Sequence, residues 1–325
     1  MVNQNNTRKK IFRKEDSREL GLGSDARNSE RMLNKDGNFN LRRTGQSLRK
    51  RISVYHDLID MRWSLFFILI FGFYFIINLV FAIFYYMMGT EHLAGIEGTN
   101  EAEKFIEAFF FSAQSLTTVG YGRISPVGFW TSLLASFEAM VGLLGFAVIT
   151  GLLYGKFTRP NARILFTKSA IIAPYKDMNA LMFRIVNERR NQLLELEVQL
   201  VIAFNQEVGG KTSRVFFPLS LETSKINFFP LPWTLVHPIN DESPMSGWDE
   251  KTMAESDAEF IILVKAYDDS FSQNVYRRYS YTYREVIWGA KYPIIWERDE
   301  KGTTILHMER VHETIKADLN QPGVI

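Results

Sequence analysis

Two long apolar runs constrain this chain more than any other feature. Residues 63–88 form a run of 26 residues without a charge, and residues 130–155 form a second run of 26 residues in which Glu138 is the single charge. A helix rises about 1.5 Å per residue, so each run is long enough to cross the roughly 30 Å hydrocarbon core of a bilayer. A buried core helix is the alternative, but soluble cores rarely contain more than about 18 consecutive apolar residues. The sequence therefore predicts two transmembrane helices.

Basic residues are distributed unevenly around these runs. Residues 1–62 contain 15 basic and 8 acidic residues, whereas residues 89–129 contain 2 basic and 5 acidic residues. Basic residues are again concentrated directly after the second run, at positions 156, 159, 163 and 168. The positive-inside rule therefore places both termini in the cytoplasm and residues 89–129 outside. We expect a multi-pass protein of the inner membrane of a bacterium.

Catalytic signatures are missing from the sequence. The chain contains no cysteine, which excludes disulfides, thiolate metal sites and cysteine nucleophiles. Its five histidines show no HExxH spacing, and there is neither a nucleophile elbow nor a phosphate-binding glycine loop. The sequence predicts no enzyme, no cofactor and no nucleic-acid partner.

The segment between the two runs combines a short helix with an irregular loop. Residues 101–116 are helical in character but too short to cross the membrane, and Asn100 with Glu103 is typical of a helix N-cap. Residues 117–122, TTVGYG, then show neither helical nor strand periodicity. Irregular backbone is tolerated at membrane depth only where protein buries it or where it lines a watery path. We therefore expect a re-entrant helix followed by a loop that lines a pore.

The loop at 118–122 reads TVGYG, which matches the known filter sequence of potassium channels. Gly120 and Gly122 can adopt backbone angles that are closed to other residues, so we expect the carbonyl groups of residues 118–121 to turn toward one axis. We expect K⁺ at Thr118, Val119, Gly120 and Tyr121, with the side chains of Val119 and Tyr121 packed behind the loop. An ordinary glycine-rich turn is the alternative. One chain supplies a quarter of a ring, so a homotetramer follows.

The region after the second run indicates β structure. Residues 194–200 (LELEVQL) alternate strictly, and residues 215–221, 259–267 and 303–308 are further strand candidates separated by turn clusters. Several short strands in this region predict a sandwich. The region contains no GxGxxG motif, and no arginine-rich additional span precedes the pore.

Ordered motifs along the chain resemble the prokaryotic branch of the inward-rectifier potassium channels. They are HDLIDMRW at 56–63, AFFFSAQSLTTVGYG at 108–122, KFTRP at 156–160, MFRIVNERRNQLLELEV at 182–198, WTLVHPI at 233–239 and EVIWG at 285–289. The resemblance implies a tetrameric α-helical pore followed by an immunoglobulin-like cytoplasmic β-sandwich.

The resulting division of the chain has four parts. Residues 1–46 are expected to be a disordered basic tail, and residues 47–62 an interfacial helix whose apolar stripe is Leu48, Ile52, Tyr55 and Ile59. A plain linker is the alternative for this helix. Residues 63–155 form the pore domain, with helices at 63–88, 101–116 and 130–155, and residues 156–325 form the cytoplasmic domain.

The resemblance also implies roles within the second span. Gly142 corresponds to the hinge glycine of the family, and Tyr154 to the large residue that gates the pore at the inner helix crossing. Phe146 occupies the cavity position that is acidic in strongly rectifying members. Aromatic residues that face lipid or pack between helices are the alternative for Phe146 and Tyr154.

Three polar residues near the loop have open roles. Glu138 is an intramembrane carboxylate, and such groups are costly and usually functional. It either raises the cation concentration in the cavity or braces the filter, and a purely structural carboxyl is the alternative. The family often has a glutamate where this chain has Gln114, so we expect the ion pair with Arg123 that supports the filter to be altered or absent.

Basic residues at the inner surface predict binding of anionic lipids such as phosphoinositides, with topological charge as the alternative. They are Arg49, Lys50, Arg62, Lys156, Arg159, Arg163, Lys168 and Arg189. His237 is either a pH sensor or a structural histidine.

Two functions remain. The first is a potassium-selective channel of inward-rectifier type, gated at the inner helix crossing and regulated through the cytoplasmic domain. The second is a membrane-anchored sensor whose pore does not conduct. The intact TVGYG sequence favours the channel.

Overall fold

The computed structural model describes residues 31–42, 44–45, 54–158, 162–189, 191–208 and 211–320. The chain divides into two compact units. One comprises residues 44–159, here called the membrane unit, and the other comprises residues 1–43 together with residues 160–325, here called the β unit.

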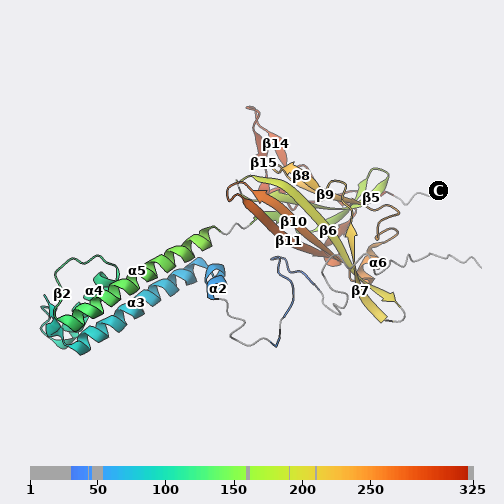
Figure 1. Ribbon diagram of the computed structural model, residues 1–325. Helices are drawn as coiled ribbons and strands as arrows, with labels where there is room; N and C mark the ends of the chain where they lie inside the picture. Colours follow the sequence, from blue (N-terminus) through green and yellow to red (C-terminus); the bar gives the residue numbers. More distant parts are fainter. Residues whose placement is uncertain are drawn as a thin grey trace, which may run out of the picture. The chain divides into compact units, whose positions relative to one another are not determined.

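The described residues of the membrane unit form four α-helices. They are α2 (Val54–Asp60), α3 (Trp63–Met88), α4 (Glu101–Leu116) and α5 (Phe129–Phe157). The described part of the chain has two helices, α3 and α5, that are long and apolar enough to cross a membrane. Figure 1 shows these two helices side by side, with α4 packed at one end of the pair. Helix α5 extends beyond the apolar run at both ends, because no proline or glycine pair interrupts it there.

Residues 89–128, which connect α3 to α5, are held against the helices by a short antiparallel strand pair and a small apolar core. After η2 (Thr90–His92), β1 (Leu93–Ala94) pairs with β2 (Ser125–Pro126). Tyr85 and Phe81 of α3, Ala108 and Phe111 of α4, and Ile124 before β2 form the buried cluster at this end. This packing holds α4 between the end of α3 and the beginning of α5, which fixes where the loop after α4 begins.

The β unit is a sandwich of two five-stranded sheets. The first sheet has the order β11-β10-β6-β7, with β8 also paired to β6, and the second has the order β12-β4-β5-β3, with β9 also paired to β5. The first sheet consists of β6 (Leu193–Val208), β7 (Lys211–Leu219), β8 (Lys225–Phe228), β10 (Glu259–Asp268) and β11 (Gln273–Thr282), and the second of β3 (Ile164–Phe166), β4 (Ala170–Tyr175), β5 (Met178–Asn187), β9 (Trp233–Pro238) and β12 (Val286–Trp288).

Smaller elements lie around the sandwich. They are α6 (Glu250–Glu255), η3 (Tyr283–Glu285), β13 (Ala290–Lys291), β14 (Trp296–Arg298), β15 (Thr304–Leu306), η4 (Met308–Arg310) and β16 (Ile315–Lys316). Strand β13 pairs with β16, and β14 pairs with β15.

Alternation along the strands places the core between the two sheets. Phe260, Ile262 and Val264 of β10 are almost fully buried in one cluster with Leu181 and Phe183 of β5 in the opposite sheet. Successive side chains of a strand point to opposite faces, so one face of each sheet supplies this core. The predicted fold class, a helical membrane pore followed by a β-sandwich, is confirmed.

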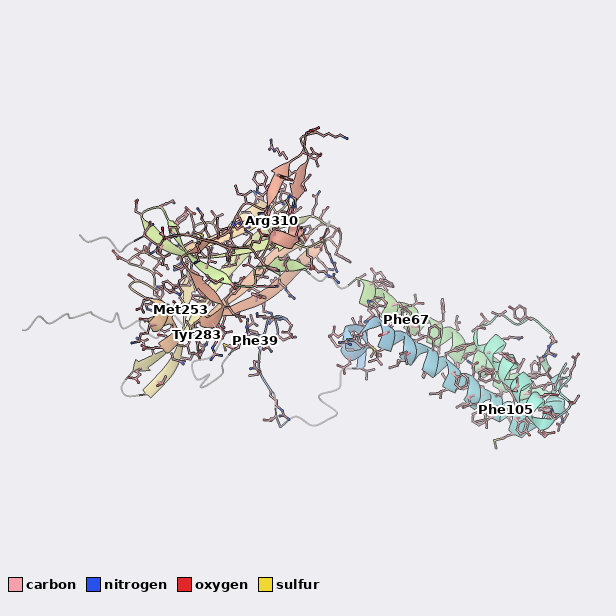
Figure 2. All side chains as sticks on the ribbon, turned by 180° about the vertical axis from the view of Figure 1, so that it is seen from behind. Phe39, Phe67, Phe105, Met253, Tyr283 and Arg310 are labelled. Atoms are coloured by element: carbon pink, nitrogen blue, oxygen red, sulfur yellow. The ribbon has the colours of Figure 1, made fainter. Side chains whose placement is uncertain are left out.

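The N-terminal segment differs from the expected disordered tail. Residues 1–30 lie outside the described residues, but residues 31–41 pack against the first sheet, and Figure 2 shows Phe39 beside it. Leu33 is fully buried, and the main-chain N–H groups of Met32 and Leu33 donate to the carboxylate of Glu259 at 2.8 and 3.1 Å. Arg31 pairs with Glu285 at 3.0 Å. Buried backbone groups that are satisfied in this way fix the segment on the sheet.

The expected interfacial helix is described in part. Helix α2 is described from Val54 to Asp60, and residues 47–53 of the expected helix lie outside the described residues. Met61 and Arg62 are not helical, and α3 begins at Trp63.

Candidate functional site

Helix α4 is capped as the sequence predicts. The Asn100 side chain accepts a hydrogen bond from the N–H of Glu103 at 2.9 Å. The Glu103 carboxylate in turn accepts from the N–H and hydroxyl of Thr99, at 2.7 and 2.8 Å. These contacts satisfy N–H groups that have no partner within the helix, so the start of α4 is fixed at Glu101.

The loop 118–122 follows the last turn of α4 directly. The N–H groups of Val119 and Gly120 both donate to the carbonyl of Gln114, at 3.0 and 3.3 Å. Gln114 is one of the residues expected to support the filter. Its main-chain oxygen accepts both hydrogen bonds, which hold the base of the loop against the end of α4.

Backbone handedness alternates along the loop. Thr118, Gly120 and Gly122 have φ values of 57°, 52° and 83°, whereas Val119 and Tyr121 between them are not left-handed. Alternation of this kind turns successive carbonyl groups to the same side of the chain, which an ordinary strand does not do. A left-handed conformation at a threonine costs roughly 1–3 kcal/mol and is retained mainly at functional sites.

Two side chains of the loop are not covered by their own chain. Val119 is 52% exposed and Tyr121 is 79% exposed. The expectation that they pack behind the loop is therefore not met within one chain. Packing of these side chains requires atoms from another copy, because the described residues of this chain leave them open.

Arg123 forms an ion pair that the sequence analysis did not identify. Its guanidinium donates to Glu107 at 3.0 Å and to the carbonyl of Gly95 at 3.2 Å. The same carboxylate accepts from the N–H groups of Glu97 and Gly98, at 2.8 and 3.2 Å. An altered pair was expected because Gln114 is uncharged. Arg123 instead pairs with Glu107, sixteen residues earlier in the chain and in the first half of α4.

Glu138 contacts side chains of α3 and α4. It is fully buried and accepts from the Tyr85 hydroxyl at 2.6 Å and from the Ser112 hydroxyl. Ser112 also lies 3.1 Å from the side-chain oxygen of Asn78. The four side chains are 0% exposed and come from α3, α4 and α5. These contacts join α4 to both long helices, whereas the expected roles of Glu138 in the cavity or at the filter stay predictions.

Gly142 permits close contact between α5 and the end of α4. A Cβ built on this glycine meets the carbonyl oxygen of Leu116 at 1.9 Å, and helix α5 passes through Gly142 without interruption. The family implied a hinge here. In this structure the glycine serves a close approach of two backbones, and the helix shows no break at it.

The base of the loop opens into an apolar groove of about 920 Å³. Thr118, Gly142 and Phe146 all line it, so the structure brings these three predicted residues together. Tyr154 does not line the groove and is 71% exposed near the C-terminal end of α5. Only 22% of α3 and 6% of α5, within their most apolar windows, are buried by the chain itself. Lipid or further copies of the chain must cover the rest.

The predicted lipid-binding residues are divided between the two units, and three of them lie outside the described residues. Arg49, Lys50 and Arg159 lie outside the described residues, whereas Arg62 in the membrane unit and Arg163 and Lys168 in the β unit are exposed and Arg189 is half-buried. Lys156 contradicts the prediction. It is 9% exposed, and its amine donates to the carbonyl oxygens of Ile59 and Met61. Its charge is directed to main-chain atoms rather than to the surface.

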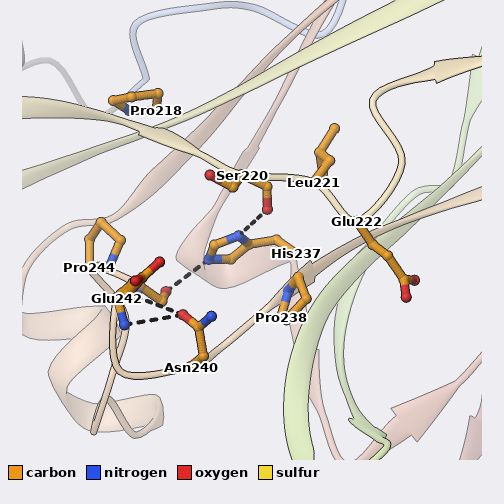
Figure 3. Close-up of a pocket in the computed structure, with 10 residues that line it drawn as sticks. Pro218, Ser220, Leu221, Glu222, His237, Pro238, Asn240, Glu242 and Pro244 are labelled. Carbon is orange, nitrogen blue, oxygen red and sulfur yellow. Dashed lines mark hydrogen bonds between the residues drawn. The ribbon is translucent and has the colours of Figure 1, made fainter.

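His237 is a buried structural histidine in β9. It lines a cavity of about 180 Å³, and Figure 3 shows the ring directed toward Ser220. Nδ1 lies 2.7 Å from the carbonyl oxygen of Ser220, and Nε2 lies 2.8 Å from the Ser243 hydroxyl. The carbonyl has no proton to give, so Nδ1 carries the hydrogen and Nε2 accepts from Ser243. Burial lowers the pKa of His237, so the ring is neutral near pH 7.

Acid is therefore expected to destabilise the β unit through His237. Because the folded-state pKa lies below the ordinary value, the unfolded chain binds more protons as pH falls below about 6.5. The stability is present above that pH and is lost below it, at up to about 1.4 kcal/mol per pH unit. Denaturant unfolding of the whole protein in detergent, compared between wild type and His237→Gln, measures this. Equal slopes in the two proteins between pH 6.5 and 5 would contradict the assignment.

Comparisons with known proteins agree with both units. Residues 63–159 match a family described as "Ion channel", and residues 164–323 match one described as "Inward rectifier potassium channel C-terminal domain". The chain is 36% identical over 285 residues to the inward rectifier potassium channel Kirbac3.1 of Paramagnetospirillum magnetotacticum. The alignment covers 87% of this chain and 95% of that protein.

Proposed function

Because the chain belongs to the inward rectifier potassium channel family, we propose that four copies of it conduct K⁺ through a ring of TVGYG loops and close the path at Tyr154. The single observation that carries the conducting role is the alternating handedness at Thr118, Gly120 and Gly122. Carbonyl oxygens turned to one side replace the hydration shell of a dehydrated ion when four loops surround an axis. The exposed Val119 and Tyr121 then pack against the neighbouring copy.

Ion uptake into vesicles tests the conducting role. The purified protein is reconstituted into liposomes loaded with K⁺, and uptake of rubidium tracer is followed. We expect uptake that barium blocks and that disappears when sodium replaces K⁺ as the driving ion. Equal uptake with sodium, or a native assembly that is not tetrameric, would refute the proposal.

The gate is proposed from the position and exposure of Tyr154. Its ring is uncovered by its own chain, near the inner end of a helix whose apolar surface is almost entirely open. Four such rings close an apolar constriction that excludes water and therefore ions.

Tyr154→Ala is expected to raise rubidium uptake severalfold, because it removes the constricting rings. The measurement is initial uptake at a fixed number of tetramers per vesicle. Phe129→Ala is the matched control, since Phe129 is an equally exposed aromatic at the outer end of the same helix. Uptake that rises equally in both variants would assign the effect to helix packing rather than to a gate.

Regulation by anionic lipid is proposed from the exposed cations. Arg62, Arg163 and Lys168 are exposed, and each lies close in sequence to an end of a membrane-crossing helix. Basic residues near an anionic surface gain roughly 1 kcal/mol each, an interaction that salt screens. We expect rubidium uptake to change with the anionic lipid fraction and this dependence to weaken from 0.1 to 1 M salt. A salt-insensitive dependence would exclude headgroup charge as its source.

A further inference from the structure

Lys156 occupies an unusual environment for a lysine. Its side chain is buried near the inner end of α5, and its amine lies 2.8 Å from the carbonyl oxygen of Ile59 and 2.5 Å from that of Met61. Lysine is almost never buried unless its charge is paired. Here the acceptors are main-chain oxygens almost one hundred residues earlier in the chain.

These oxygens belong to the C-terminal end of α2. The last carbonyl groups of a helix have no partner within it and carry a partial negative charge. An amine that donates to them satisfies the orphan groups and compensates the helix dipole. Lys156 therefore caps α2 from a different helix.

Aromatic rings enclose the same amine. It lies 5.0 Å from the centre of the Trp63 ring and 5.3 Å from the centre of the Phe66 ring, both in the first turn of α3. The Trp63 ring also packs against Phe157, with 4.7 Å between the ring centres. A cation held over two rings away from water adds to the same attachment.

The neighbouring glycine brings α2 into direct contact with α5. A Cβ on Gly155 meets the Tyr55 hydroxyl at 2.9 Å and the Ile59 side chain at 3.0 Å. Residues 155, 156 and 157 thus each contact α2 or the beginning of α3, and they follow Tyr154 directly. Three consecutive residues of α5 therefore contribute to the contact with α2 and the beginning of α3.

We propose that Lys156 is a positioning residue that fastens α2 to the inner end of α5, so that the two move as one unit. A displacement of α2 along the membrane surface then displaces Tyr154. The attachment itself depends only on the contacts above, whereas its effect on conduction rests on the gate proposed for Tyr154.

Spin-label distances test the attachment directly. The chain contains no cysteine, so labels attach only at introduced ones, here at Val54 of α2 and Leu133 of α5, which are 64% and 50% exposed. Labelled subunits are diluted with unlabelled ones to give one labelled copy per tetramer, in vesicles of neutral phosphatidylcholine. The variants are Lys156→Met, which keeps the apolar stem and removes the donor, and Lys156→Arg, which restores a donor. Arg62→Met removes an exposed cation from the junction of α2 and α3 and is the matched control.

We expect Lys156→Met to broaden the distance distribution, Lys156→Arg to return it toward the wild-type width, and Arg62→Met to leave it unchanged. A wild-type distribution in Lys156→Met, or broadening that appears only with anionic lipid, would overturn the proposal. Rubidium uptake of the same samples separates the two proposals. Broadening with unaltered uptake contradicts the gate at Tyr154 and leaves the attachment standing.

Discussion

Gly120→Ala is expected to reduce rubidium uptake by more than about 100-fold. The position has a φ of 52° and open space around it, so the conformation rather than a clash opposes the new side chain. A left-handed alanine costs roughly 1–2 kcal/mol, and four copies in one ring raise the cost to roughly 4–8 kcal/mol. The loop relieves this strain by turning a carbonyl away from the axis, which removes a ligand of the ion.

The control is Gly145→Ala. Gly145 also has open space around it, but it lies within α5 and its φ is not positive. Alanine favours a helix over glycine by about 1 kcal/mol, so uptake and tetramer stability should be retained. Conduction by Gly120→Ala at the level of Gly145→Ala, with tetramers intact, would show that the loop does not need left-handed backbone at this position.

Gly142→Ala is expected to reduce uptake by more than about 10-fold and to destabilise the protein. The added Cβ meets the Leu116 carbonyl oxygen at 1.9 Å, and Leu116 is itself 8% exposed and unable to withdraw freely. Overpacking of this kind costs typically 1–3 kcal/mol per site. The strain displaces the end of α4 and therefore the loop that its Gln114 carbonyl holds.

Binding of K⁺ distinguishes this contact from a hinge. If Gly142 separates two backbones, Gly142→Ala weakens both K⁺ binding, measured by calorimetry, and uptake, because the loop itself moves. A hinge role predicts normal K⁺ binding with altered opening alone. Gly151→Ala on the same helix, where a Cβ meets nothing within 4 Å, should affect neither measurement.

The helices and the sandwich could be predicted because their signals are local. The length of the apolar runs sets α3 and α5, and Asn100 with Glu103 marks the start of α4 within one turn. Strict alternation along residues 194–200 identifies β6, since one face of that strand must be apolar to enter the core. In each case the deciding interaction lies within a few residues of the pattern.

No local sequence pattern indicates that residues 31–41 pack against the first sheet or that Lys156 is buried. Residues 31–41 are polar and carry no periodicity, and their partners Glu259 and Glu285 follow more than two hundred residues later. Lys156 binds main-chain oxygens, which every sequence supplies equally. The contacts of Glu138 could be predicted only in part. Asn78 and Glu138 stand out as polar residues in their apolar runs, but their common contact with Ser112 depends on how three helices pack.

The path of the chain between its two units has a mechanical consequence. The chain leaves the β unit at residue 43 and re-enters it at residue 160, so two separate connections join the units within one subunit. The first connection follows the segment in which Leu33 is buried and its main-chain N–H donates to Glu259. A single proteolytic cut in one of these connections therefore leaves the β unit covalently attached to the membrane unit through the other.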